Sequence, residues 1–238
     1  MKKILYLLSI LSVISFQASA YVPPIINASI VDSKGEFQAA FTYGSVGAEQ
    51  YFAYGATEDL YLYISSSFTV DTIYTYSKKR SHYFFEGGFG YSSTAGYWVF
   101  SMGGAYGYGQ FYNEYRNVIE SSSTRTMNSI NLAANHHKIS IQSDIGLKKP
   151  FVELVFSNRF SVGYFSSTDP EYKISNSTIS FFEPGVTLKA GPGKVKFMSQ
   201  FRLGLPLNRT NTDMSYSAIS IGLILHLGQE EYKVEATE

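Results

Sequence analysis

The chain has 238 residues, no cysteine and 19 basic against 19 acidic residues, so its formal net charge is zero. This balance gives no support to a nucleic-acid-binding role, and the lack of cysteine excludes disulfide bonds. Charged residues make up only 16% of the chain, against 20 Tyr, 18 Phe and 20 Gly. Such a composition is typical of strands and turns, and it is poor in charge for a surface in contact with water.

The N-terminus has the three parts of an export signal. Lys2 and Lys3 form the positive start, residues 4–16 are apolar, and Ala18-Ser19-Ala20 is a cleavage site of the A-x-A type. The apolar run is too short to cross a bilayer as a helix. We therefore expect residues 1–20 to be a cleaved signal peptide, the mature chain to begin at Tyr21, and residues 21–35 to form a periplasmic N-terminal lead.

Period-two alternation of apolar and polar residues dominates the rest of the chain. Between Val195 and Leu207, for example, the apolar side chains occupy alternate positions, and Lys196 and Arg202 lie on the opposite face. The same pattern predicts about ten strands, whose ranges are roughly 36–44, 47–55, 59–70, 82–93, 96–112, 130–148, 151–166, 178–190, 194–207 and 216–228. A phase change near His136 and His137 predicts a bulge, or a strand that rises above the membrane.

Short and long connections alternate between these strands. Tight turns are expected at 55–58, 93–95, 149–150 and 191–193, and longer polar loops at 71–81, 113–129, 167–177 and 208–215. This layout, with strands long enough to cross hydrocarbon, favours an all-β antiparallel transmembrane barrel over residues 36–228. About ten strands fit the pattern best, with 8 or 12 as alternatives. Residues 229–238 are a polar C-terminal tail.

The two faces of the predicted strands differ in charge. No charged residue falls on the apolar face, as expected of a surface in contact with lipid. The opposite face would line the lumen, and we expect a polar network there, made by Glu86, Asp144, Glu153, Arg159, Glu183, Lys189, Lys194, Lys196 and Arg202, with Lys138, Glu36 and Glu49 on the same face. A soluble secreted β-sandwich remains the alternative, with the apolar face as its core.

Several glycine-rich and aromatic segments resemble those of the small, mostly uncharacterised outer-membrane β-barrel proteins of Bacteroidetes-type bacteria. They are 22–24, 34–36, 85–91, 103–109, 141–146 and 182–185. The resemblance implies a barrel in the outer membrane and no known activity. The chain departs from such barrels at its end, because its last strand closes on Leu227-Gly228 rather than on an aromatic residue.

The sequence shows no motif for a metal, a cofactor or a nucleophile. The four histidines have no metal-binding spacing, and Ser140 lies about 13 Å along the strand from His136 at ~3.3 Å per residue. We therefore expect no cofactor, no metal and no catalytic residue, and we predict that the chain is not an enzyme. A lipid-modifying enzyme in the outer membrane remains an alternative.

These observations predict an outer-membrane barrel whose lumen is plugged, with a structural or surface-interaction role carried by its long outer loops. A porin-like pore for small solutes is the first alternative, although ten strands lie nearer to the barrel size that side chains fill than to the size that leaves a water channel. The expected partners are outer-membrane lipid and the barrel-assembly machinery, with no nucleic acid, and the protein is expected to be a monomer.

Overall fold

The computed structural model describes residues 24–26, 31, 33–73, 78–121, 124–167, 177–208 and 217–228. The predicted signal peptide, its cleavage site and the predicted polar tail lie outside these residues. No helix in this part of the chain is long and apolar enough to cross a membrane.

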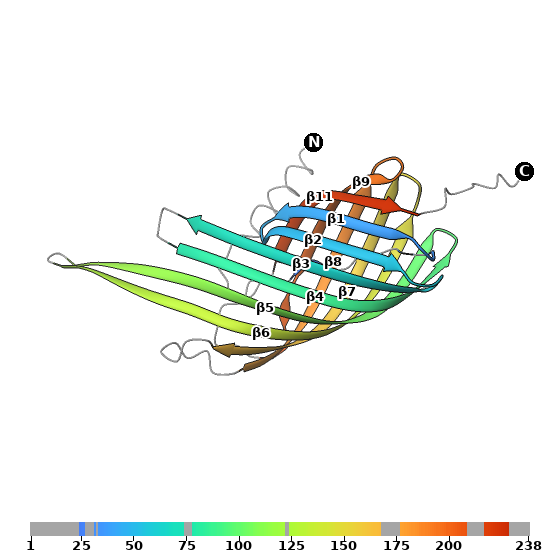
Figure 1. Cartoon of the computed structure of the whole chain (residues 1–238). Helices are drawn as coiled ribbons and strands as arrows, with labels where there is room; N and C mark the ends of the chain where they lie inside the picture. The colour runs from blue at the N-terminus through green and yellow to red at the C-terminus, as the bar shows by residue number, and fades with distance from the viewer. Residues whose placement is uncertain are drawn as a thin grey trace, which may run out of the picture.

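All described regular structure is β-strand, as period-two alternation predicts. The strands are β1 (Phe37–Gly44), β2 (Gly47–Gly55), β3 (Leu60–Ile73), β4 (Lys78–Ala95), β5 (Trp98–Ser121), β6 (Thr124–Lys148), β7 (Val152–Ser167), β8 (Ser177–Ala190), β9 (Val195–Leu203), β10 (Leu205–Pro206) and β11 (Ser217–Leu227). Neighbouring strands pair antiparallel around the molecule, and the first and last strands, β1 and β11, also pair, so the sheet closes on itself (Figure 1). Since β9 and β10 form one interrupted barrel strand, the fold is the predicted closed antiparallel barrel of ten strands.

The interruption between β9 and β10 has a local cause in the facing strand. The register is the same on both sides of the gap, with Gly185 opposite Arg202 and Phe182 opposite Leu205. Between them lies Pro184 of β8, which has no backbone N–H to donate to the ladder. The pairing therefore opens at Gly204 without a change of register.

Successive side chains point into the barrel and out of it by turns. On β6, Lys138 and Ser140 are buried in the lumen, whereas Ile139 and Ile141 are each 65% exposed on the outside. No Asp, Glu, Lys or Arg faces outward from a strand wherever the structure describes the side chains. A sandwich would bury its apolar face, so this apolar exterior around a charged interior excludes the soluble alternative and is the construction of an outer-membrane barrel.

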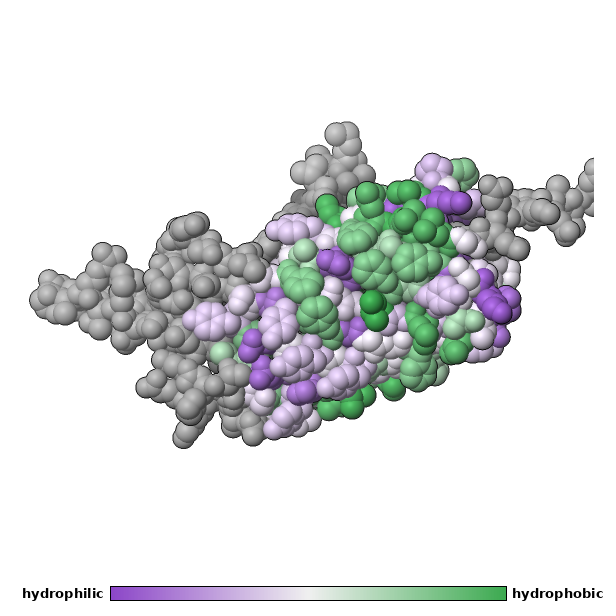
Figure 2. Space-filling model, in the orientation of Figure 1, coloured by the Kyte–Doolittle hydropathy of each residue, from purple (hydrophilic) through white to green (hydrophobic). Residues whose placement is uncertain are grey.

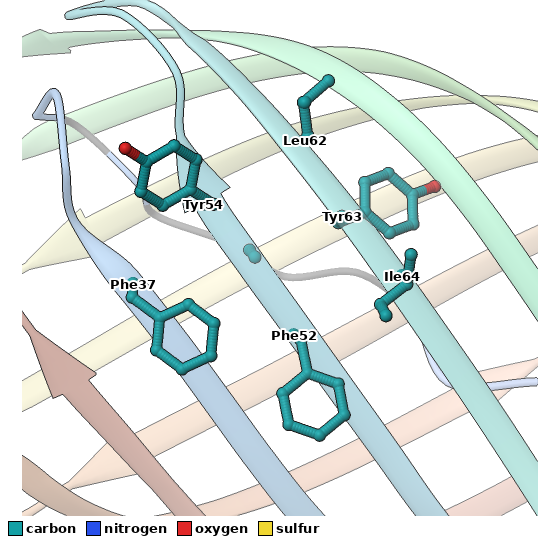
Figure 3. Close-up of a pocket in the computed structure, with 7 residues that line it drawn as sticks. Phe37, Phe52, Tyr54, Leu62, Tyr63 and Ile64 are labelled. Carbon is teal, nitrogen blue, oxygen red and sulfur yellow. The ribbon is translucent and has the colours of Figure 1, made fainter.

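The apolar exterior is visible over the strands nearest the viewer. Figure 2 shows hydrophobic side chains gathered over β11, β1, β2 and β3. A shallow depression on this surface is lined by Phe37, Phe52, Ala53, Tyr54, Leu62, Tyr63 and Ile64 (Figure 3). Its apolar lining suits a lipid acyl chain.

The structure corrects two features of the predicted connections. Residues 113–129 were expected to form a loop, but β5 and β6 continue as a paired hairpin to Ser121 and Thr124. Most of the expected loop at 71–81 likewise belongs to β3 and β4. The bulge expected near His136 is absent from the described part of β6, because its register with β5 and β7 runs unbroken past that residue. The predicted loops at 167–177 and 208–215 lie largely outside the described residues.

Candidate functional site

The lumen of the barrel holds the densest group of polar side chains in the described part of the chain. Six carboxylates and six cationic side chains are buried there: Glu36, Glu49, Glu86, Asp144, Glu153 and Glu183, with Lys138, Lys148, Arg159, Lys189, Lys196 and Arg202. Eight of the nine residues predicted to form the network are among them. Lys194 is the exception, because it lies exposed in the turn between β8 and β9.

Four of these side chains form a central cluster drawn from four strands. Arg159 Nε of β7 lies 2.6 Å from Glu183 Oε2 of β8, and Lys138 Nζ of β6 lies 3.4 Å from the same oxygen. Glu86 of β4 completes the group, with its carboxylate 3.6 Å from both Arg159 Nη1 and Lys138 Nζ. All four side chains are at most 1% exposed. Two acids and two bases thus neutralise each other in a space without bulk water, where an unpaired charge is very costly.

Further pairs surround the central cluster. Glu153 lies between Lys189 Nζ at 3.3 Å and Lys196 Nζ at 2.5 Å. Arg202 pairs with Glu49 and donates to Gln200 at 3.0 Å. Glu153 and Lys189 join the neighbouring strands β7 and β8, whereas the pairs of Glu153 with Lys196 and of Arg202 with Glu49 join strands that are not adjacent. These pairs therefore hold the barrel together as well as neutralising the lumen.

Two other lumen carboxylates have polar partners other than Lys and Arg. Asp144 accepts hydrogen bonds from Ser101 at 2.6 Å and from Gln142 at 2.8 Å. The Glu36 carboxylate accepts a hydrogen bond from Gln38 at 2.8 Å and lies 3.5 Å from His226 Nδ1. His226 is fully buried in the lumen.

The N-terminal lead also enters the lumen. Arg159 donates from Nη2 to the Pro24 carbonyl at 3.1 Å and from Nη1 to the Ile25 carbonyl at 3.3 Å. Gln200 accepts from the Ile26 N–H at 3.1 Å and donates to the Ile26 carbonyl at 3.0 Å, so its amide pairs with this backbone as a neighbouring strand would. The described part of the lead is therefore bound inside the barrel.

The apolar side chains of the lead pack against tyrosines of the wall. Ile25 and Val31 are 1% and 2% exposed, and they belong to one cluster of buried residues with Tyr51, Tyr61 and Tyr63 of β2 and β3. Ser92 of β4 donates a hydrogen bond to the Val31 carbonyl. This cluster fills the part of the lumen beside the central ion pairs, since Tyr63 Oη reaches Glu86 at 3.4 Å.

A stack of rings fills the lumen on the other side of the ion pairs. The His136 ring lies between Phe84, with centroids 5.0 Å apart, and Phe165, with centroids 5.4 Å apart. Phe111 and Phe181 extend the group, and Lys138 Nζ lies 5.2 Å from the centre of the Phe84 ring. We call His82, Phe84, Phe111, His136, Phe165 and Phe181 the aromatic cluster.

Glycines of the wall make room for the aromatic cluster. A Cβ atom on Gly107 would lie 2.2 Å from the Phe84 ring, and one on Gly109 would lie 2.7 Å from the His136 ring. Gly107 and Gly109 thus leave space for bulky neighbours inside the barrel. The stack itself was not predicted, because it depends on which strands pair, although glycines facing inward beside aromatic residues were a usable signal.

The histidines lie as the alternation predicted. His136 faces the lumen, whereas His137 faces outward, and its Nδ1 lies 2.6 Å from Tyr106 Oη. Among the described residues no group of three or more His, Asp or Glu side chains could hold a metal ion. The expectation that no cofactor is bound stays a prediction.

No protein-family model and no curated protein matches the chain. Among solved structures it is similar to LpxR from Salmonella typhimurium, with 10% identity, a TM-score of 0.35, and coverage of 80% of this chain and 99% of that one. It is also similar to a loop L8 deletion mutant of OmpT, an outer membrane protein of Vibrio cholerae, with 9% identity, a TM-score of 0.29, and coverage of 81% and 97%. Values this low carry no argument for a particular activity, and the resemblance to Bacteroidetes barrels stays a prediction.

The prediction that the chain is not an enzyme is wrong as a conclusion from its sequence, and we withdraw it. His136 and Ser140 are too far apart along one strand to act together, but a barrel brings together side chains from different strands, which that prediction did not consider.

Proposed function

We propose that the protein is an outer-membrane barrel whose lumen is closed by its own residues and which makes its contacts outside the cell through its outer connections. In this proposal the protein is exported by its cleaved signal peptide and inserted with its tight turns toward the periplasm. The observation that carries the closed lumen is the binding of Pro24–Ile26 by Arg159 and Gln200.

Three groups of side chains, arranged one after another inside the barrel, support closure of the lumen. The tyrosine cluster around Ile25 lies on one side of the central ion pairs, and the aromatic cluster lies on the other. A barrel of about eight strands is just filled by side chains. Ten strands enclose more space, and here the N-terminal lead and long Arg and Lys side chains occupy it.

The β5–β6 hairpin is the structural basis for contacts outside the cell. Beyond its last pairs with β4 and β7, the hairpin continues from Glu114 and Asn131 to Ser121 and Thr124, which at a rise of ~3.3 Å per residue is about 23 Å. Figure 1 shows these two strands extending beyond the others at the end opposite the tight turns. A paired ribbon of this length would carry its tip well above the lipid headgroups, where a surface partner is accessible.

The test is conductance in planar bilayers. We expect no steady conductance from the unmodified protein. Deletion of residues 24–31 alone, or Phe84→Ala with Phe165→Ala alone, should leave the lumen blocked, because the other fillings remain. The combination of the deletion and both substitutions should conduct, because only the ion pairs then obstruct the lumen.

Slower migration after boiling than before, the mark of an intact barrel, is the control that each variant is folded. A steady, large conductance from the unmodified protein would refute closure and favour the pore. A folded combined variant that still does not conduct would show that the ion pairs alone close the lumen and that the lead has another role.

A further inference from the structure

The Asn158 side chain of β7 lies on the lipid-facing surface of the barrel. The outward residues of β7 are Val152, Leu154, Phe156, Asn158, Phe160, Val162 and Tyr164, and Asn158 is exposed among apolar neighbours on both sides. Asn158 lies six positions after Val152. This separation is about 20 Å along a strand, or about 15 Å along the membrane normal at the usual tilt. The apolar band of such barrels is ~25 Å tall, so the Asn158 amide lies near its middle.

The amide has no partner on its own barrel. None of the described residues makes a hydrogen bond with the Asn158 side chain, whereas the polar side chains of the lumen are extensively paired. Lipid acyl chains have no hydrogen-bonding groups, so an amide that faces them is left unsatisfied. A partner must therefore come from another molecule at the same depth.

The surroundings of Asn158 favour close approach by such a molecule. Ser143 of β6 and Pro184 of β8 are the cross-strand neighbours of Asn158, and Ser143 is also exposed. These shorter side chains lie between flanking rows that contain Ile141 and Phe160 on one side and Ile145 and Phe156 on the other. The outer face thus carries a row of shorter side chains, two of them polar, between rows of larger apolar ones.

A second copy of this chain supplies the complementary chemistry. An asparagine amide carries both donors and an acceptor, so two Asn158 side chains related by a two-fold axis can each donate to the other. Amide and hydroxyl side chains hold transmembrane segments together in this way. A lipid offers no such group at this depth, so self-association satisfies Asn158 without any other component.

We propose that this protein forms a two-fold symmetric dimer in the membrane through the β6–β8 face centred on Asn158. The interface joins two Asn158 amides by reciprocal hydrogen bonds, with Ser143 beside them and the rims of Ile and Phe side chains in contact. The dimer replaces the monomer expected from the sequence.

The test uses the absence of cysteine from the sequence. Ser143→Cys places one thiol beside Asn158 without removing the amide, and a short thiol-specific bifunctional reagent then links two copies in intact outer membranes. We expect a crosslinked dimer from Ser143→Cys. Ile64→Cys, which is 60% exposed on β3 outside the β6–β8 face, is the matched control and should remain monomeric.

The role of the amide is tested on the same background. Ser143→Cys with Asn158→Leu should lose the crosslinked dimer, and Ser143→Cys with Asn158→Gln should keep it. Asn158→Leu removes a polar group from the lipid face, so the barrel should remain folded by the boiling test.

Three results would overturn the proposal. They are equal crosslinking of Ser143→Cys and Ile64→Cys, unchanged crosslinking in the Asn158→Leu variant, and capture by Ser143→Cys of a protein of different mass in place of a second copy.

Discussion

The inner and outer faces of the barrel are built from the same strands, yet they treat polar groups in opposite ways. Inside, six carboxylates and six cations are buried, and the central ones lie within 3.6 Å of opposite charges. Outside, the amide of Asn158 is exposed and makes no hydrogen bond with the described residues. A closed barrel therefore tolerates polar side chains inside, because strands that face one another across the lumen can supply their partners. The outer face has no such opposite wall.

The largest expected effect comes from removing a partner on the inside. Arg159→Ala leaves Glu183 and Glu86 short of a cation and frees the carbonyls of the N-terminal lead. Breaking a buried pair in this way costs about 3–5 kcal/mol, so the free energy of unfolding in urea should fall by that amount. Arg159→Met combined with Glu183→Met removes both members and should cost less. An unchanged unfolding midpoint for Arg159→Ala would show that the ion pairs do not stabilise the barrel.

The second effect comes from placing a charge on the outside. Ile141→Arg puts a guanidinium among acyl chains and should cost about 2–4 kcal/mol in the same unfolding measurement. Leu207→Arg is the matched control, because Leu207 is 60% exposed just beyond the short strand β10. A charge near the interface costs about 0–1 kcal/mol. Equal losses at the two positions would place the membrane elsewhere on the barrel.

The smallest effect compares the two faces of a single strand with one added methyl group. Gly107→Ala would bring Cβ to 2.2 Å from the Phe84 ring, so we expect overpacking to cost about 1–3 kcal/mol. Gly104→Ala on the outer face meets only the Ser140 carbonyl at 3.6 Å and should be neutral. Phe84→Leu should relieve the Gly107→Ala variant. Equal unfolding free energies for the two alanine variants would mean that the rings have room to move.

The sequence predicted the faces of the barrel well because the membrane imposes a strict period-two pattern. Inward and outward positions on β6 and β9 follow directly from alternation, and with them Lys138, Lys196 and Arg202. Lys194 was misplaced because it is adjacent to the first residue of β9, where alternation still continues but the chain has already turned.

Other features escaped the sequence because their causes are not periodic. Beyond the membrane both faces of a hairpin contact water, so no apolar alternation marked residues 113–129 as strand. The position of the N-terminal lead depends on Arg159 of β7 and Gln200 of β9, which lie far from the lead in the sequence. The aromatic cluster depends on the pairing of His136 with Gly109 and Phe165, which only the register decides.

The lead inside the lumen has a consequence for the order of assembly. Ile25 contacts Arg159 across 134 positions of sequence, and Ile26 contacts Gln200 across 174. These bonds cannot form until β7 and β9 are in place, yet the lead precedes every strand in the sequence. Such distant contacts are slow to close. The lead can therefore take its place in the lumen only after the strands that bind it, at the end of barrel assembly rather than at its start.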